Sequence, residues 1–350
     1  MKNKALFALL SGLLLLVAQA FAQQFNYVSI DVHCDADANA TDCPAGLAPG
    51  GTALGTWASG ITPGGQIVGG YVGQADGLEH GYLYSNGTFT TIDVPGSLVG
   101  LPSDVRLETE VNGINPAGDM VGDYFALPGS PGAPACIVAY SPPCDRGFLY
   151  RHGQFSSVLV PGPGHSGSIA SSITPDGAIY GCLHDQTFGI EMFGFARTQS
   201  GNYKTLSYKT LEAGGGELAD TNQSMSPSMN NGATPDGNTI VGLYVPKGSS
   251  FAHGYKVQNG VFSDYVFPGS RATQIWGINP NGDFVGLYRD TLGVHGFLQP
   301  ADGAVPVGLN YPQATKTEAL GINPGGAIVG LYVDAGGGTH GFLAASISTD

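Results

Sequence analysis

Oxygen-bearing side chains alternate along one short segment that two cysteines, Cys34 and Cys43, enclose. The segment carries Asp35, Asp37, Asn39 and Asp42. Carboxylate and amide oxygens at such positions resemble the start of a calcium-binding loop. However, Ala40 stands where that loop has glycine, and Gly46 stands where it has a bidentate glutamate. Two interpretations follow, a calcium site or an acidic surface loop closed by a disulfide, and the sequence favours the second.

A second group of residues could do acid–base chemistry. Glu108 and Glu110 point to one face if their segment is extended. Such carboxylates could act as acid or base on a glycan, with His165 transferring a proton. The chain has 27 acidic residues, so one close pair is weak support for catalysis. No Gly-x-Ser-x-Gly, His-Glu-x-x-His or phosphate-binding Gly-x-x-x-x-Gly-Lys motif occurs, which favours a non-catalytic protein.

The two tryptophans of the chain, Trp57 and Trp276, each stand shortly before the same turn motif. Aromatic rings among mixed polar groups can hold a sugar or a peptide. We expect a binding site on the loops that lead into the first strand of each repeat. The candidate residues are Trp57, Arg106, Glu108, Glu110, His165, Arg271, Gln274, Trp276, Lys316 and Glu318. The alternative for the tryptophans is simple packing between inner strands.

Histidines and aspartates also recur. The histidines are His80, His253, His295 and His340, and the aspartates are Asp185, Asp290 and Asp334. Equivalent residues of separate repeats lie too far apart to share a metal ion at about 2 Å. We therefore expect each histidine to bond a local turn or backbone group, and each aspartate to form an Asx turn.

These residues are positioned by a repeat. The motif Ile/Ala-Asn/Thr-Pro-x-Gly occurs six times, with prolines 53, 59, 60, 45 and 44 residues apart. The motif suits a tight turn, because Asn or Thr accepts a backbone bond, Pro fixes φ and Gly takes the left-handed conformation. Short alternating apolar runs surround it, which indicates four strands per repeat. Periods near 45 residues are typical of propeller blades.

The ends of the chain indicate closure. The sixth repeat stops after its third strand, near Leu343, whereas the segment Phe25–Val32 resembles the fourth strand Phe89–Val94. An N-terminal strand that completes the last repeat would leave no exposed sheet edge. The prediction is an all-β, six-bladed β-propeller, monomeric, with residues 23–350 forming one domain.

The motifs His80-Gly81-Tyr82, His253-Gly254-Tyr255, His295-Gly296-Phe297 and His340-Gly341-Phe342 follow these turns. They resemble the extracellular HAF repeat of bacterial exported proteins. Repeats two and three depart from it, with Arg146 and Phe193 in place of histidine. The resemblance implies an exported repeat protein and no catalytic residues.

The N-terminus predicts export. Lys2 and Lys4 precede an apolar run, and Ala20-Phe21-Ala22 offers a cleavage site, so residues 1–22 form a signal peptide. The run is too short for a stable membrane span. In a secreted or periplasmic protein we expect two loop disulfides, Cys34–Cys43 and Cys136–Cys144. Cys182 lies in an apolar run, so we expect its thiol to be buried.

The net charge of −14 argues against nucleic acid or an anionic membrane as partner, and is compatible with cations and neutral sugars. The sequence thus favours an exported, non-catalytic binding or scaffold propeller without a cofactor, with a glycan or a protein as ligand at the channel mouth. The alternative is a lyase or hydrolase acting on an extracellular glycan at the same place.

Overall fold

The computed structural model describes residues 25–100, 107–125, 145–162, 165–185, 191–206, 228–246 and 249–347. Its regular elements are β-strands and one short 3-10 turn, η1 (Gly96–Val99), as the all-β prediction requires. None of the described segments is a helix long and apolar enough to cross a membrane. The predicted signal peptide, Arg106 and the pair Cys136 and Cys144 lie outside the described residues.

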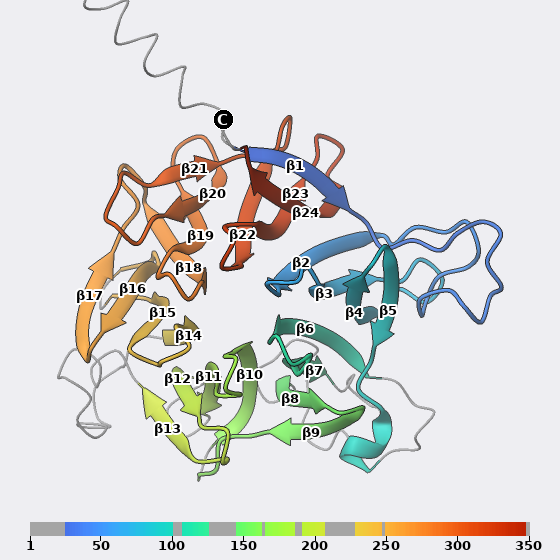
Figure 1. The fold of residues 1–350 in the computed structure, drawn as a ribbon, viewed down its shortest axis with the longest axis horizontal. Coiled ribbons are helices and arrows are strands. Elements are labelled where there is room, and N and C mark those ends of the chain that lie inside the picture. Colours follow the sequence, from blue (N-terminus) through green and yellow to red (C-terminus); the bar gives the residue numbers. More distant parts are fainter. Residues whose placement is uncertain are drawn as a thin grey trace, which may run out of the picture.

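The strands form antiparallel four-stranded units that stand around a central axis (Figure 1). One unit comprises β6 (Glu108–Ile114), β7 (Met120–Phe125), β8 (Asp145–Arg151) and β9 (Gln154–Val158). The next comprises β10 (His165–Ile173), β11 (Ile179–Asp185), β12 (Glu191–Arg197) and β13 (Tyr203–Leu206). A further one comprises β14 (Ser228–Ala233), β15 (Thr239–Tyr244), β16 (His253–Gln258) and β17 (Val261–Tyr265).

The remaining strands are linked into one larger mixed sheet. It contains β2 (Gly55–Ile61), β3 (Ile67–Val72), β4 (Glu79–Ser85) and β5 (Thr88–Ile92). It also contains β18 (Ala272–Ile278), β19 (Phe284–Arg289), β20 (Val294–Gln299) and β21 (Val307–Leu309). Its last strands are β22 (Lys316–Ile322), β23 (Ile328–Val333), β24 (Thr339–Ser346) and β1 (Phe25–Ile30). Single parallel pairs, Gly55 with Thr339 and Val294 with Lys316, connect these antiparallel groups at their edges.

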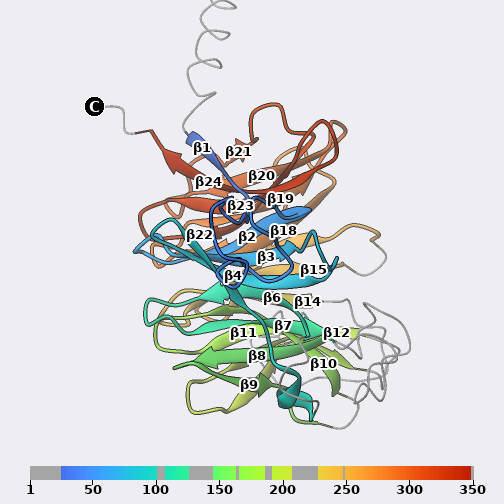
Figure 2. The same ribbon diagram turned by 90° about the vertical axis from the view of Figure 1, so that its right-hand side faces the viewer.

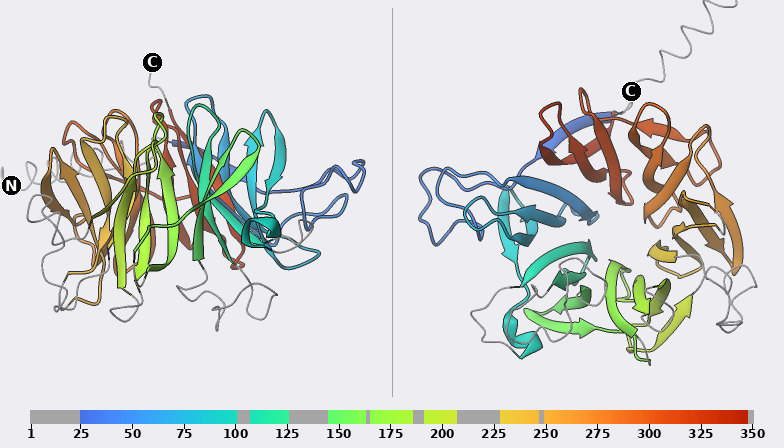
Figure 3. Two further views of the ribbon diagram at one scale, coloured as in Figure 1. Left: turned by 90° about the horizontal axis from the view of Figure 1, so that it is seen from below. Right: turned by 180° about the vertical axis from the view of Figure 1, so that it is seen from behind.

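The two ends of the chain meet in one sheet. Strand β1 pairs with β24 in antiparallel register, from Phe25 opposite Ser346 to Ile30 opposite Gly341. This confirms the predicted pairing of the N-terminal strand with the last repeat. The innermost strands also contact one another in cyclic order, including β22 with β2 (Figure 3). Across that junction, Asn323 Nδ2 donates to the carbonyl oxygen of Thr62 at 3.3 Å.

The hydrophobic core lies between neighbouring sheets, which face each other in the side view (Figure 2). The aromatic residue after the His-Gly motif, or its equivalent, is fully buried in every repeat. These residues are Tyr82, Phe148, Phe195, Tyr255, Phe297 and Phe342. The glycine before the aromatic residue lets the next unit approach, because a Cβ on Gly81 would come within 2.7 Å of Val111.

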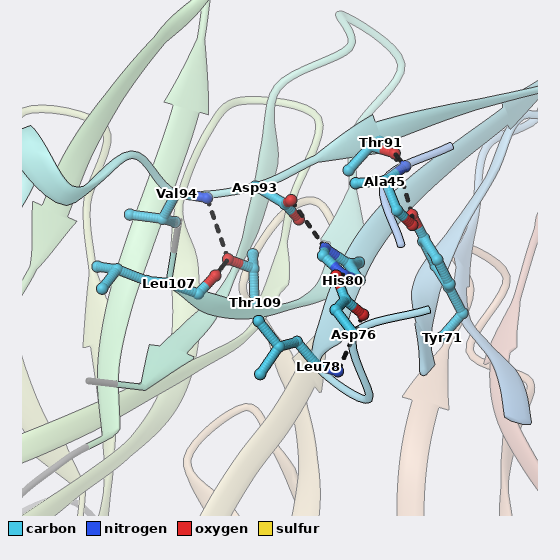
Figure 4. A network of polar contacts seen from close by, with 10 residues as sticks. All are labelled: Ala45, Tyr71, Asp76, Leu78, His80, Thr91, Asp93, Val94, Leu107 and Thr109. Atoms are coloured by element: carbon cyan, nitrogen blue, oxygen red, sulfur yellow. Dashed lines mark hydrogen bonds and ion pairs between the residues drawn. The ribbon is translucent and has the colours of Figure 1, made fainter. Parts of the chain in front are cut away.

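The repeated histidines bridge two parts of their own unit. His80 is 3% exposed, and its Nδ1 lies 2.8 Å from Asp93 at the end of β5 (Figure 4). Its Nε2 lies 3.1 Å from Asp76, in the turn between β3 and β4. The other histidines have equivalent strand-end partners: His253 with Asp264, His295 with Asn310 and His340 with Asp31. The predicted turn partner is confirmed for His80, His295 and His340, which contact Asp76, Asp290 and Asp334. For His253 the only partner among the described residues is the strand residue Asp264. Asp31, the partner of His340, directly follows the N-terminal strand.

The recurring aspartates behave as predicted where their side chains are described. Asp290 Oδ1 accepts from the backbone N–H of Leu292 at 2.7 Å, and Asp334 Oδ1 accepts from that of Gly336 at 2.8 Å. Both are Asx turns. The side chain of Asp185 lies outside the described residues.

The substitution His80→Gln should lower the free energy of unfolding by about 1.5–3 kcal/mol at mildly acidic pH, and by less at alkaline pH. Burial lowers the pKa of His80, but the hydrogen bonds and charges of Asp93 and Asp76 outweigh it, so the pKa is raised. Stability from a raised histidine pKa is fully present below the unfolded value, about 6.5, and is lost as pH rises through the folded value. Urea unfolding of both proteins across this range measures the difference.

The matched control is His33→Gln, because the side chain of His33 is 52% exposed. It should change stability little at any pH. A His80→Gln penalty that stayed constant from acid to alkaline pH would contradict the ionic bridge.

Candidate functional site

Each innermost strand carries a β-bulge at the same position. In β2 the register shifts between Ala58 and Gly60, so that Ser59 is the extra residue. The equivalent shifts in the other innermost strands fall at Val111/Gly113, Ala170/Ser172, Asn230/Gly232, Ile275/Gly277 and Ala319/Gly321. A bulge bends its strand and re-aims side chains. The inner strands are therefore shaped alike in every repeat.

A glycine on the second strand accommodates each bulge. A Cβ added to Gly69 would overlap the carbonyl oxygen of Trp57, the residue two positions before the extra one. The same overlap occurs at Gly122, Gly181, Gly242, Gly286 and Gly330. The repeated glycine of the second strand thus has a steric cause.

The bulged strands surround a central cavity of about 490 Å³. One ring of lining residues precedes the bulge and comprises Trp57, Glu110, Ile169, Met229 and Glu318. A second ring occupies the bulge and comprises Ser59, Asn112, Ser171, Asn231, Trp276 and Leu320. Mostly isoleucines follow as a third ring, at Ile61, Ile114, Ile173, Ala233, Ile278 and Ile322. The volume lies in the range of small-molecule sites.

One side of the cavity is aromatic and acidic. The indole Nε1 of Trp57 donates to Glu110 Oε1 at 2.5 Å. The ring of Trp57 lies against the backbone of Gly70, since a Cβ there would overlap the indole. The positions equivalent to Gly70 hold larger residues in the other repeats, namely Asp123, Cys182, Leu243, Leu287 and Leu331. Gly70 therefore makes the space that the Trp57 side chain occupies.

Glu110 faces Asp123 across the β6–β7 pair. Asp123 is 2% exposed and accepts from Asn112 Nδ2 at 2.7 Å. Burial raises the pKa of Glu110 to about 7; the hydrogen bond from Trp57 opposes this shift, and the charge of Glu79 adds to it. Glu110 is thus a carboxyl group that exchanges its proton near neutral pH, which suits a general acid or base.

The opposite side of the cavity is apolar with scattered polar atoms. Ile169 and Met229 stand where the acidic side has Trp57 and Glu110. Met229 belongs to a small core with Cys182 and Leu243, against which Ile169 and Trp276 pack. Ser171 Oγ, Ser172 Oγ and Asn231 Oδ1 are buried and have no hydrogen-bond partner among the described residues. The apolar side of the wall therefore contains buried polar atoms, too.

Eight of the ten predicted ligand-binding residues lie on the innermost strands and not in loops, which corrects the expectation for them. They are Trp57, Glu108, Glu110, His165, Gln274, Trp276, Lys316 and Glu318. Trp57, Glu110, Trp276 and Glu318 line the cavity. Two more support them: Gln274 accepts from Trp276 Nε1 at 3.2 Å, and Lys316 forms an ion pair with Glu318 at 2.8 Å. The innermost strands begin several residues before the turn motif. Residues that we expected in loops therefore lie within these strands, on the wall of the cavity.

The other predicted residues do not join this group. Glu108 shares strand β6 with Glu110 but is 6% exposed and does not line the cavity. Arg271 is exposed just before β18. The side chain of His165 lies outside the described residues. Both tryptophans are half-buried on the cavity wall. Each also contacts a neighbouring unit, because Trp57 bonds Glu110 of β6 and Trp276 packs against the core of Cys182, Met229 and Leu243. They therefore pack between inner strands as well as lining the cavity.

The acidic loop after β1 is closed by the predicted disulfide Cys34–Cys43. Asp35, Asp37 and Asp42 do not form a group of three that could hold a metal ion. Asn39 Nδ2 donates to Asp42 at 3.0 Å, so the amide nitrogen faces the carboxylate. The geometry supports the disulfide-closed surface loop. Cys182 is a buried thiol, as predicted.

Sequence reasoning missed Gly70, Asn112, Asp123 and Asn231. A signal for two of them exists. When the repeats are aligned on the second-strand glycine, the next residue is Gly70 or Asp123 in the first two repeats and Cys or Leu in the others. Departures from an apolar position mark the polar side of the cavity.

Substituting Gly69→Ala should destabilise the protein by more than about 3 kcal/mol, because the new Cβ must displace the carbonyl that closes the bulge. Chemical unfolding, or the yield of folded protein, measures the effect. The control is Gly64→Ala in the same repeat, where the nearest atom would be 3.8 Å away. Equal, small effects of the two substitutions would contradict the steric account.

The fluorescence of Trp57 should report the titration of Glu110. In a Trp276→Phe background Trp57 is the only tryptophan, and its emission should change with a midpoint at about pH 7, because its indole bonds a carboxyl group of that pKa. Adding Glu110→Gln should remove the transition. A midpoint in the ordinary carboxyl range near 4 would show that Glu110 is solvated.

No protein-family model matches the chain, and no curated protein matches it. Among solved structures it is similar to TolB from Acinetobacter baumannii, with 17% identity, a TM-score of 0.47 and 74% of this chain covered. The match spans 54% of the TolB chain. Virginiamycin B lyase from Staphylococcus aureus has 10% identity and a TM-score of 0.44, covering 92% of this chain and all of that one. The six-bladed lectin of Aleuria aurantia has 8% identity and a TM-score of 0.43, covering 82% and 95%. At these scores no function is transferred.

Proposed function

We propose that the chain is an exported, closed six-bladed β-propeller that binds a small polyhydroxylated ligand, such as a glycan unit, in its central cavity. One observation carries the proposal: both tryptophans of the chain line the same cavity. Half-buried indoles beside amide, hydroxyl and carboxyl groups suit a sugar, which has apolar faces and many hydroxyl groups.

The six-bladed count rests on the four-stranded units and on β1, which supplies the fourth strand beside β24. Export is supported by the predicted signal peptide and by the disulfide Cys34–Cys43, since disulfides persist in oxidising compartments. The HAF-repeat resemblance agrees with both. A protein partner is the less favoured ligand, because the tryptophans and polar groups face a cavity rather than an outer surface.

A second candidate function is acid–base catalysis on the bound glycan, as in a lyase or hydrolase. The observation that favours it is Glu110, whose pKa of about 7 lets it take or give a proton at neutral pH. Asp123 faces it on the next strand. Glu108 has no part in this version, because it is buried and does not line the cavity.

The substitutions Trp57→Phe and Trp276→Phe should each weaken binding of a cavity ligand about tenfold, because a smaller ring and a lost N–H remove roughly 1–2 kcal/mol of interaction. A panel of neutral oligosaccharides is screened by thermal shift, since a ligand at a hundred times its Kd adds about 2.7 kcal/mol to stability. The ligand found is then titrated by calorimetry.

The control variant is Leu292→Ala, which changes a side chain that is 86% exposed and outside the cavity. Unchanged affinity in both tryptophan variants would place the ligand elsewhere. The enzyme would be favoured over the binding protein if the unsubstituted protein converts the bound sugar into a product and Glu110→Gln still binds the sugar but forms no product.

A further inference from the structure

We propose that the ligand of the central cavity is a hydroxylated organic cation whose ammonium group binds beside Glu110 and Trp57. This rests on the proposed function, since it concerns the same cavity, and it names the charge of the ligand. An amino sugar and a hydroxylated alkylammonium compound share this chemistry.

The charges on the cavity wall favour a positively charged ligand. Glu110, Asp123 and Glu318 line the cavity, and no Lys or Arg is among its described lining residues. Lys316 already compensates Glu318 at 2.8 Å. Asn112 donates to Asp123. An anionic ligand such as a phosphate ester would meet like charges and no cationic partner, which costs free energy in a partly desolvated site.

Glu110 is the carboxylate that such a cation would pair with. Its hydrogen-bond donor is the neutral indole of Trp57, and no cation lies within ion-pair distance of it among the described residues. A desolvated carboxylate without a counter-charge is unfavourable, and it gains most from an incoming cation. A neutral sugar would leave it uncompensated.

The aromatic residues and the opposite wall fit the rest of such a molecule. Cations bind over aromatic rings, best over tryptophan, and the indoles of Trp57 and Trp276 are both half-buried on the wall. Asn231 is 1% exposed, and its Oδ1 has no partner among the described residues although its Nδ2 donates to Ile275 at 2.7 Å. Ile169 and Met229 line the same side of the cavity and can pack against the alkyl groups of the ligand.

Binding of a cation beside Glu110 should be coupled to the loss of the proton from this carboxyl group. Among the charged groups around Glu110, Asp123 lies opposite it on β7, and Glu79 on β4 acts on it by its charge. Glu108 precedes it on β6 and is influenced by His80. Glu318 shares the cavity wall and is already paired with Lys316. The pKa of Glu110 is raised to about 7, so a cation that prefers the ionised form must displace its proton. Affinity for a permanent cation should therefore rise with pH and level off above the pKa, with proton release on binding.

The test compares choline with 3,3-dimethylbutan-1-ol, a neutral molecule of the same shape, by calorimetric titration of the mature protein. Choline should bind at least about tenfold more tightly than the alcohol. Its association constant should rise about tenfold between about pH 6 and pH 8, because that interval takes Glu110 from mostly protonated to mostly ionised. Glu110→Gln should weaken choline binding and remove the pH dependence.

Asp302→Asn is the matched control, because it removes one negative charge from an exposed loop outside the cavity. It should bind choline as the unsubstituted protein does. Equal affinity for choline and the alcohol, pH-independent binding, or no choline binding would each overturn the cationic assignment. Neutral oligosaccharides in the same titrations separate the two proposals: sugar binding without choline binding leaves the cavity function standing, whereas no binding of either removes both.

Discussion

The contact between an inner-strand carbonyl and a second-strand glycine is the constraint on which the rest of the structure depends. The bulge turns one carbonyl oxygen toward the second strand, where only a residue without a Cβ leaves room. Because this contact recurs in every repeat, each inner strand presents the side chain within its bulge to the same central space. Five of the six strands also present the side chain two positions earlier. The cavity wall is thus built from equivalent positions that can vary in chemistry without altering the fold.

Close approach between units sets the width of that space. A Cβ on Gly277 would come within 2.7 Å of the carbonyl oxygen of Leu320 in the next unit, and one on Gly321 would come equally close to Ser59. These glycines allow neighbouring backbones to pack around the axis. The second contact also joins the last repeat to the first. The wall is therefore continuous across the junction of the chain ends, and the cavity remains small enough for a single small ligand.

The sequence predicted the architecture better than the site. The repeated turn and the match between Phe25–Val32 and Phe89–Val94 indicated the strands and the pairing of β1 with β24, since local turn chemistry and period-two alternation determine both. The site depends on contacts between strands. Asp123 follows Glu110 by 13 residues yet lies opposite it, and Gly70 matters only because Trp57 lies over it. Spacing along the chain instead suggested Glu108 as the partner of Glu110. Burial determined that only one of these two carboxylates reaches the cavity.

The repeats also provide an internal comparison for the acidic side of the cavity. The position of Glu110 is occupied by Ile169 and Met229 in the two following units, opposite Cys182 and Leu243, and those units have the same bulge and the same glycine. The fold therefore accepts apolar residues at this position. A desolvated carboxyl group facing Asp123 is less favourable than such a pair, because burial disfavours its charged form. The hydrogen bonds from Trp57 to Glu110 and from Asn112 to Asp123 offset part of that cost. A carboxyl pair at a position where the fold accepts apolar residues is a departure of the kind that functional sites make.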